Sequence, residues 1–168
     1  MQITDQQVIA DVLHVAGEKF LLSISSPLEL LLVYHLASLK TEDLGNALQK
    51  HVNTLRSRGF EPKVVYVDPQ SRLTSLQGKF PGIEIDVSGA GDHLDKLDIR
   101  MRRLKELMHS VVSRLPICFK KERVKDLMTY AVSGTNLKSM SFLNTNACPR
   151  VRFTGFKPDY KSEFGLAF

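Results

Sequence analysis

The 168-residue chain is long enough for one domain with a sizeable core, and its 43% hydrophobic and 24% charged residues exclude collagen-like and disordered classes. Its two cysteines, Cys118 and Cys148, lie far apart and form no CxxC pair, which excludes a disulfide framework and indicates a reducing, intracellular setting. The most apolar stretch, residues 28–39, is too short and too interrupted by polar residues to span a bilayer. The net charge is +5, and residues 96–125 carry 10 basic against 3 acidic side chains.

The first part of the chain predicts a three-stranded meander. Residues 7–15 are rich in β-branched side chains, Gly17-Glu18 can form a tight turn, and residues 20–25 are a second apolar run. The segment Leu28–Leu36 after Pro27 is short enough to be either a strand or a buried helical turn. We expect a strand, because a hairpin alone is marginally stable and a third strand would complete the meander.

The middle of the chain predicts alternating helices and strands. A helix is expected from Thr41, whose hydroxyl can cap free amides, to Gly59, which suits a left-handed stop. The apolar run at residues 64–67 is typical of a strand buried on both faces. A short helix at 70–78, a strand at 83–87 and a turn at 88–91 follow.

The longest predicted helix, residues 93–115, carries an apolar stripe and a basic face. The stripe recurs every three or four residues, which is typical of a surface that faces the core; it consists of Leu97, Met101, Leu104, Met108 and Val111. The basic residues, called the basic strip below, are Lys96, Arg100, Arg102, Arg103 and Lys105. A cationic strip beside an acidic body favours an anionic polymer such as a nucleic acid, although a solvated helix face explains the charge equally well.

The end of the chain predicts one more helix and a tail. The helix is expected after Pro116, at residues 121–132, and residues 149–168 are expected to be irregular and basic. We therefore assign residues 1–148 to a core domain and 149–168 to a C-terminal extension that would lead into a further region of a longer polypeptide. The order of elements predicts an α/β fold, with a mixed five-stranded sheet flanked by helices.

Three aspartates are candidates for metal ligands. Asp11 shares a strand face with Ile9 and Leu13, Asp68 ends the apolar strand, and Asp98 lies at the margin of the apolar stripe. Carboxylates that converge from two strands and a helix could hold hard divalent cations, which offset their mutual repulsion. Each aspartate also has a purely structural interpretation: an edge-strand residue, a turn former before a proline, or a first-turn helix residue.

Four segments together resemble the integrase core of copia-type retrotransposons, in a divergent branch. In chain order they are ADVLHVAGEKFLLSISSPLELL, RSRGFEPKVVYVDPQSRLTSL, GIEIDVSGAGDHLDKLDIRMRRLKEL and FTGFKPDY. The resemblance covers nearly the whole chain and implies the ribonuclease H-like fold of retroviral integrases and DDE transposases. By position, Asp11 and Asp68 match the first two catalytic acids, and Asp98 stands where the family usually has glutamate.

The resemblance implies a polynucleotidyl transferase or nuclease that cuts and joins DNA strands during integration of a retrotransposon. Asp11, Asp68 and Asp98 would hold two Mg²⁺ or Mn²⁺ ions, and the basic strip would hold the DNA backbone. The expected partners are the element's DNA ends, the target DNA and further copies of the chain, with no membrane and no small-molecule cofactor. The expected location is intracellular, and nuclear in a eukaryote.

A second hypothesis keeps the fold without the chemistry. Because Asp98 is one methylene shorter than glutamate, its oxygens would retreat from a metal unless the backbone shifts, and small misplacements are costly in catalysis. The chain would then be a degenerate or domesticated module that binds nucleic acid. The two hypotheses differ in whether the chain binds divalent metal.

Overall fold

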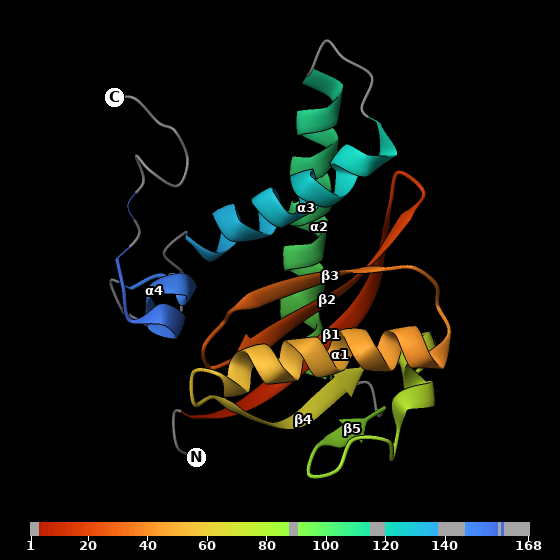
Figure 1. The fold of residues 1–168 in the computed structure, drawn as a ribbon, viewed down its shortest axis with the longest axis vertical. Helices are drawn as coiled ribbons and strands as arrows, with labels where there is room; N and C mark the ends of the chain where they lie inside the picture. The colour runs from red at the N-terminus through yellow and green to blue at the C-terminus, as the bar shows by residue number, and fades with distance from the viewer. Residues whose placement is uncertain (1–3, 88–90, 115–119, 138–146, 158, 160–168) are drawn as a thin grey trace.

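A five-stranded mixed sheet forms the centre of the molecule in the computed structural model, which describes residues 4–87, 91–114, 120–137, 147–157 and 159 (Figure 1). The strand order is β3-β2-β1-β4-β5, with β1 antiparallel to β2, β2 antiparallel to β3, and β4 parallel to both β1 and β5. The strands are β1 (Asp5–Val15), β2 (Glu18–Ser26), β3 (Leu31–Leu36), β4 (Glu61–Val67) and β5 (Glu84–Asp86). The predicted α/β fold is confirmed, and the arrangement agrees with a ribonuclease H-like fold.

The hairpin between β1 and β2 turns one residue earlier than predicted. Val15 pairs with Glu18, so the two turn residues are Ala16 and Gly17, with φ angles of 50° and 80°. Two-residue hairpin loops favour positive φ at both positions, because that twist matches the twist of the strands. Alanine rarely adopts a positive φ, so conformational preference favoured Gly17-Glu18 as the turn, and that prediction is wrong by one residue.

Helices cover both faces of the sheet (Figure 1). One face packs against α1 and η1, and the other packs against α2 and α3. The helical elements are α1 (Thr41–Arg56), η1 (Arg72–Leu76), α2 (Gly91–Arg114), α3 (Lys121–Asn136) and α4 (Pro149–Thr154). None of these described helices has a stretch long and apolar enough to cross a bilayer.

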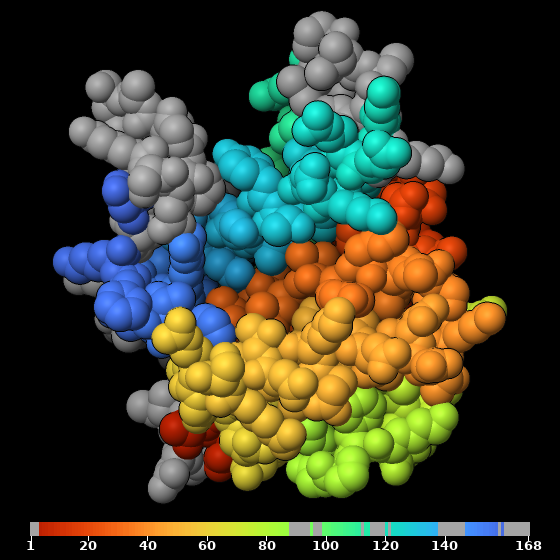
Figure 2. All heavy atoms as spheres, in the orientation of Figure 1, coloured from red at the N-terminus to blue at the C-terminus, as the bar shows by residue number. Residues whose placement is uncertain are grey.

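The segment expected to be an irregular tail begins with a helix. Pro149 occupies the start of α4, where a proline needs no amide partner, and Gly155 ends it with a φ of 75°. The ring of Phe153 stacks on Phe60, with centroids 6.0 Å apart, which holds α4 near the end of α1. Figure 2 shows α4, in blue, against that end of α1, in yellow. Residues 160–168 of the predicted extension lie outside the described residues.

Strand β1 is buried on both faces of the sheet, because successive apolar residues along it point to opposite faces. Val8 and Ala10 belong to the core cluster beneath α1, whereas Ile9 and Leu13 belong to the cluster beneath α2 and α3. The predicted stripe of α2 reaches this second cluster, with Met101, Leu104 and Met108 all buried; the side chain of Leu97 lies outside the described residues. Asp11 has the same parity as Ile9 and Leu13, so it belongs to the α2 face of the sheet.

A buried polar pair joins α1 to the sheet. Oγ of Ser23 on β2 lies 2.7 Å from Nδ1 of His51, which is only 4% exposed. Burial lowers the pKa of His51 to about 4, and the backbone of Val33 partly opposes that change. The histidine is therefore neutral at physiological pH.

Strand β3 ends the sheet, and α3 covers the start of its outer edge. The side-chain amide of Asn136, at the end of α3, accepts a hydrogen bond from Leu31 N at 2.9 Å and donates one to Leu31 O at 2.7 Å. Asn136 is itself buried. One amide side chain thus satisfies both backbone groups of an edge-strand residue.

Candidate metal and nucleic-acid site

The pairing of β1 with β4 brings Asp11 and Asp68 to the same end of the two strands. The last paired residues of the two parallel strands are Ala10 and Val67, and the two aspartates come directly after them. Ile9 and Tyr66, which lie two residues before Asp11 and Asp68, pair with each other and belong to or pack against the cluster beneath α2 and α3. Side chains alternate along a strand and neighbouring strands are about 4.8 Å apart, so the same register continued by one residue would put Asp68 beside Asp11 on the α2 face.

Backbone amides orient both carboxylates. Oδ1 of Asp11, a half-buried residue, accepts a hydrogen bond of 2.6 Å from Val12 N. Oδ1 of Asp68, an exposed residue, accepts one of 2.6 Å from Gln70 N, and its carbonyl accepts another from Ser71 N. Asp68 therefore does form the turn that its structural interpretation predicted. This role leaves room for metal binding, because a carboxylate has about four acceptor positions.

Asp98 lies on α2, the helix that packs over the sheet face of Asp11. Its side chain lies outside the described residues. Position 98 is three residues before Met101, which contacts the same cluster as Ile9. The fold thus brings the element that carries the third predicted acid to the face that carries the first two.

Asp86 is an acidic residue of this region that the sequence analysis did not single out. It ends β5, is half-buried, and pairs with Tyr66, so it shares the α2 face of the sheet with Asp11. The signal was present in the sequence, because Asp86 follows the alternating residues Ile83, Glu84 and Ile85, a pattern typical of a strand. Its pairing partner, Tyr66, lies two residues before Asp68, so Asp86 is a further acidic residue at this end of the sheet.

The described side chains alone do not complete a metal site. Among them, no group of three or more His, Cys, Asp and Glu residues is arranged to hold a metal ion, and this set does not include Asp98. The carboxylate oxygens of Asp11 and Asp68 are nevertheless the ligand type that Mg²⁺ and Mn²⁺ prefer. A third oxygen ligand is needed to make the pair a strong site.

The basic strip divides into an exposed part and a buried residue. Arg102, Arg103 and Lys105 are exposed on α2, and positions 98, 102 and 105 share one face of the helix by their spacing. The side chain of Lys96 lies outside the described residues.

Arg100 differs from the other members of the strip, because it is only 8% exposed. Its Nη1 donates to Glu29 O at 2.9 Å, and its Nη2 lies 3.7 Å from Glu29 Oε2. Burial lowers the pKa of Arg100, and the negative charge of Glu29 opposes that change. The surface cations available to a polyanion are therefore fewer than the charge count suggested.

No protein-family model and no curated protein sequence matches this chain. Any assignment of function therefore depends on the geometry of the aspartates, on the charge of α2 and on the resemblance of the motifs.

Proposed function

We propose that the chain is the catalytic core of a copia-type retrotransposon integrase, which cuts and joins DNA phosphodiester bonds with the help of divalent metal. The observation that carries this proposal is the register of β1 and β4. The last pair is Ala10 with Val67, so the next residues, Asp11 and Asp68, follow at the same end of the two strands. The strand order and the order of the motifs along the chain support it.

In this proposal, Asp11, Asp68 and Asp98 supply the oxygen ligands. Bound Mg²⁺ or Mn²⁺ would orient a water or a DNA 3′-hydroxyl for in-line attack on a phosphodiester and stabilise the leaving oxygen. The hydrogen bonds from Val12 N and Gln70 N fix one oxygen of Asp11 and of Asp68, respectively, which lowers the entropy lost when a ligand binds. The carboxylates do not themselves form a bond to the DNA.

The exposed residues Arg102, Arg103 and Lys105 would contact DNA phosphates beside this site. Contacts to phosphate position DNA without reading its sequence, which suits an enzyme that must act on both element ends and target DNA. Nuclear localisation and assembly into multimers belong to this proposal and follow only from the resemblance.

The metal site can be tested by calorimetric titration of Mn²⁺ into the wild-type chain, Asp68→Asn and Asp5→Asn. Asp5→Asn is the matched control, because it removes a carboxylate from the far end of β1. We expect saturable binding in the wild type and in the control, and loss of binding in Asp68→Asn with the fold retained. Equal binding by Asp68→Asn and the wild type would refute the site.

Absence of Mn²⁺ binding in the wild type would favour the second candidate, a nucleic-acid-binding module without chemistry. The exposed cations of α2 favour this candidate, since they need no metal to bind a polyanion.

Both candidates predict that Arg102→Glu with Lys105→Glu weakens DNA binding about equally across sequences. The slope of the logarithm of the binding constant against the logarithm of the salt concentration should fall in magnitude by about 2. The control is Arg58→Glu with Arg72→Glu, two exposed arginines from the segments around α1 and η1. An equal effect of the control pair would move the DNA surface away from α2.

A further inference from the structure

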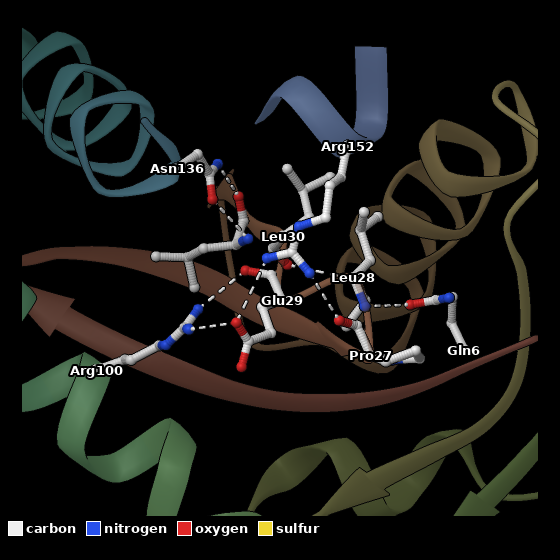
Figure 3. A network of polar contacts seen from close by, with 10 residues as sticks. Gln6, Pro27, Leu28, Glu29, Leu30, Arg100, Asn136 and Arg152 are labelled. Atoms are coloured by element: carbon white, nitrogen blue, oxygen red, sulfur yellow. Dashed lines mark hydrogen bonds and ion pairs between the residues drawn. The ribbon is translucent and has the colours of Figure 1, made fainter. Parts of the chain in front are cut away.

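Side chains from four distant elements converge on the loop between β2 and β3 (Figure 3). Leu28 N donates to Oε1 of Gln6 on β1 at 3.1 Å, and Leu31 is held by Asn136 of α3. Glu29 O accepts from Arg100 of α2 at 2.9 Å, and Pro27 O accepts from Nη1 of Arg152 on α4 at 3.2 Å. We call residues 27–31 the hub loop. It links β1 to α2, α3 and α4.

Glu29 lies at the centre of the hub loop in an unusual conformation. Its φ is 61°, in the left-handed region that residues with side chains seldom adopt. Its carboxylate is 12% exposed and lies between two guanidinium groups, 3.7 Å from Nη2 of Arg100 and 3.6 Å from Nη2 of Arg152. Figure 3 shows both arginines pointing at Glu29 from opposite sides. A strained backbone and a desolvated charge persist only where the surroundings hold them, and such places cluster at functional sites.

The contact with Arg100 gives α2 a directional anchor. The contacts of Met101, Leu104 and Met108 with the sheet are apolar, and apolar packing has little directional preference. The hydrogen bond from Arg100 to Glu29 O and the facing carboxylate, by contrast, restrict both rotation and sliding of the helix. Residue 98 lies about 3 Å along the helix axis from residue 100, so any movement of α2 moves Asp98 with it.

We propose that Glu29 is a positioning residue for the candidate metal site, because it holds α2, the helix that carries residue 98, over the sheet face that carries Asp11. This inference rests on the proposed metal function. Through Arg152, the same carboxylate also couples the docking of α4 to the placement of α2. The start of the C-terminal extension is thereby connected to the site, although α4 lies on the opposite side of the hub loop from α2 (Figure 3).

The test compares Mn²⁺ affinity and amide hydrogen exchange of α2 in the wild type, Glu29→Gln, Arg152→Met and Val52→Ala. Glu29→Gln removes the charge with little change of shape, and Arg152→Met removes only the link to α4. Val52→Ala is the control for lost stability, because Val52 is 1% exposed in the cluster beneath α1. All titrations are run well below the melting temperature of each variant.

We expect Glu29→Gln to weaken Mn²⁺ binding about 10- to 100-fold, the range seen when residues that support metal ligands are changed, and to speed exchange in α2. Arg152→Met should weaken binding less, by a few-fold, and it keeps the inference testable if Glu29→Gln fails to fold. Val52→Ala should lower the melting temperature and leave the affinity unchanged.

Three outcomes separate this inference from the function on which it rests. Wild-type affinity in both Glu29→Gln and Arg152→Met would overturn the positioning role while the metal site stands. Equal loss of affinity in Val52→Ala would also overturn it, because general destabilisation would then explain the result. No Mn²⁺ binding by the wild type would overturn the metal function itself.

Discussion

The buried histidine of α1 makes stability depend on pH in a way that can be calculated. His51 is 4% exposed and bonded to Ser23, and burial lowers its pKa from 6.5 to about 4. In the unfolded chain the histidine takes up a proton near pH 6.5, whereas the folded chain resists protonation until about pH 4. The contribution of neutral His51 to stability is therefore complete above pH 6.5 and is lost as the pH falls towards 4.

The magnitude follows from the difference between the two pKa values. Each pKa unit corresponds to about 1.4 kcal/mol, so the protein should lose about 3 kcal/mol of unfolding free energy through His51 alone on acidification. This is a large fraction of the about 5–15 kcal/mol that is typical of a domain.

The assay is urea denaturation of the wild type and of Ser23→Ala with His51→Leu at about pH 7 and about pH 4. The double variant removes both members of the buried pair, so that neither polar group is left without its partner. We expect the unfolding free energy of the wild type to fall by about 3 kcal/mol more than that of the double variant. Ionisable groups common to both chains cancel in this comparison.

A single variant, Ser23→Ala, is the control, and it should keep most of the acid dependence because His51 stays buried. Equal losses in the wild type and the double variant would refute the reasoning. They would mean that His51 becomes hydrated or protonated in the folded protein without cost.

Two further predictions concern packing and the surface. Met108→Ala should lower the unfolding free energy by about 2–5 kcal/mol in urea denaturation, because Met108 of α2 is 1% exposed in the cluster between that helix and the sheet. A loss below about 1 kcal/mol would mean that the cluster collapses around the gap. Arg56→Met should change the unfolding free energy by less than about 1 kcal/mol, although Arg56 forms a 2.6 Å ion pair with Glu61, because both side chains are more than a third exposed. A larger change would show that this pair stabilises the turn between α1 and β4.

The elements with strong local patterns could be predicted from the sequence. The alternation in β1 and the stripe through Met101, Leu104 and Met108 depend only on residues near in sequence, and both occur as expected. The convergence of Asp11 and Asp68 stays a prediction, because it depends on strands that are far apart in the chain. The pairing of β1 with β4 meets one condition for it, since the two strands are neighbours.

The hub loop could not be predicted, because its partners are far apart in the chain. Glu29 and Arg100 are separated by 71 residues, and a charge count treats Arg100 like any other cation on the helix. Its burial depends on where α2 crosses the sheet, which is a tertiary property. Helix α4, by contrast, had a readable signal in Pro149 and Gly155, which a focus on the basic charge of the tail overlooked.

The amide of Asn136 has a consequence for how the sheet ends. It presents to Leu31 the same donor and acceptor that the backbone of a sixth strand would present. Open edge strands are templates on which other chains can add by strand pairing, and proteins block them to avoid aggregation. The side chain of Asn136 occupies the backbone donor and acceptor of Leu31, the first residue of β3. A strand of a neighbouring molecule therefore cannot form hydrogen bonds with Leu31, and extension of the sheet is opposed at this residue.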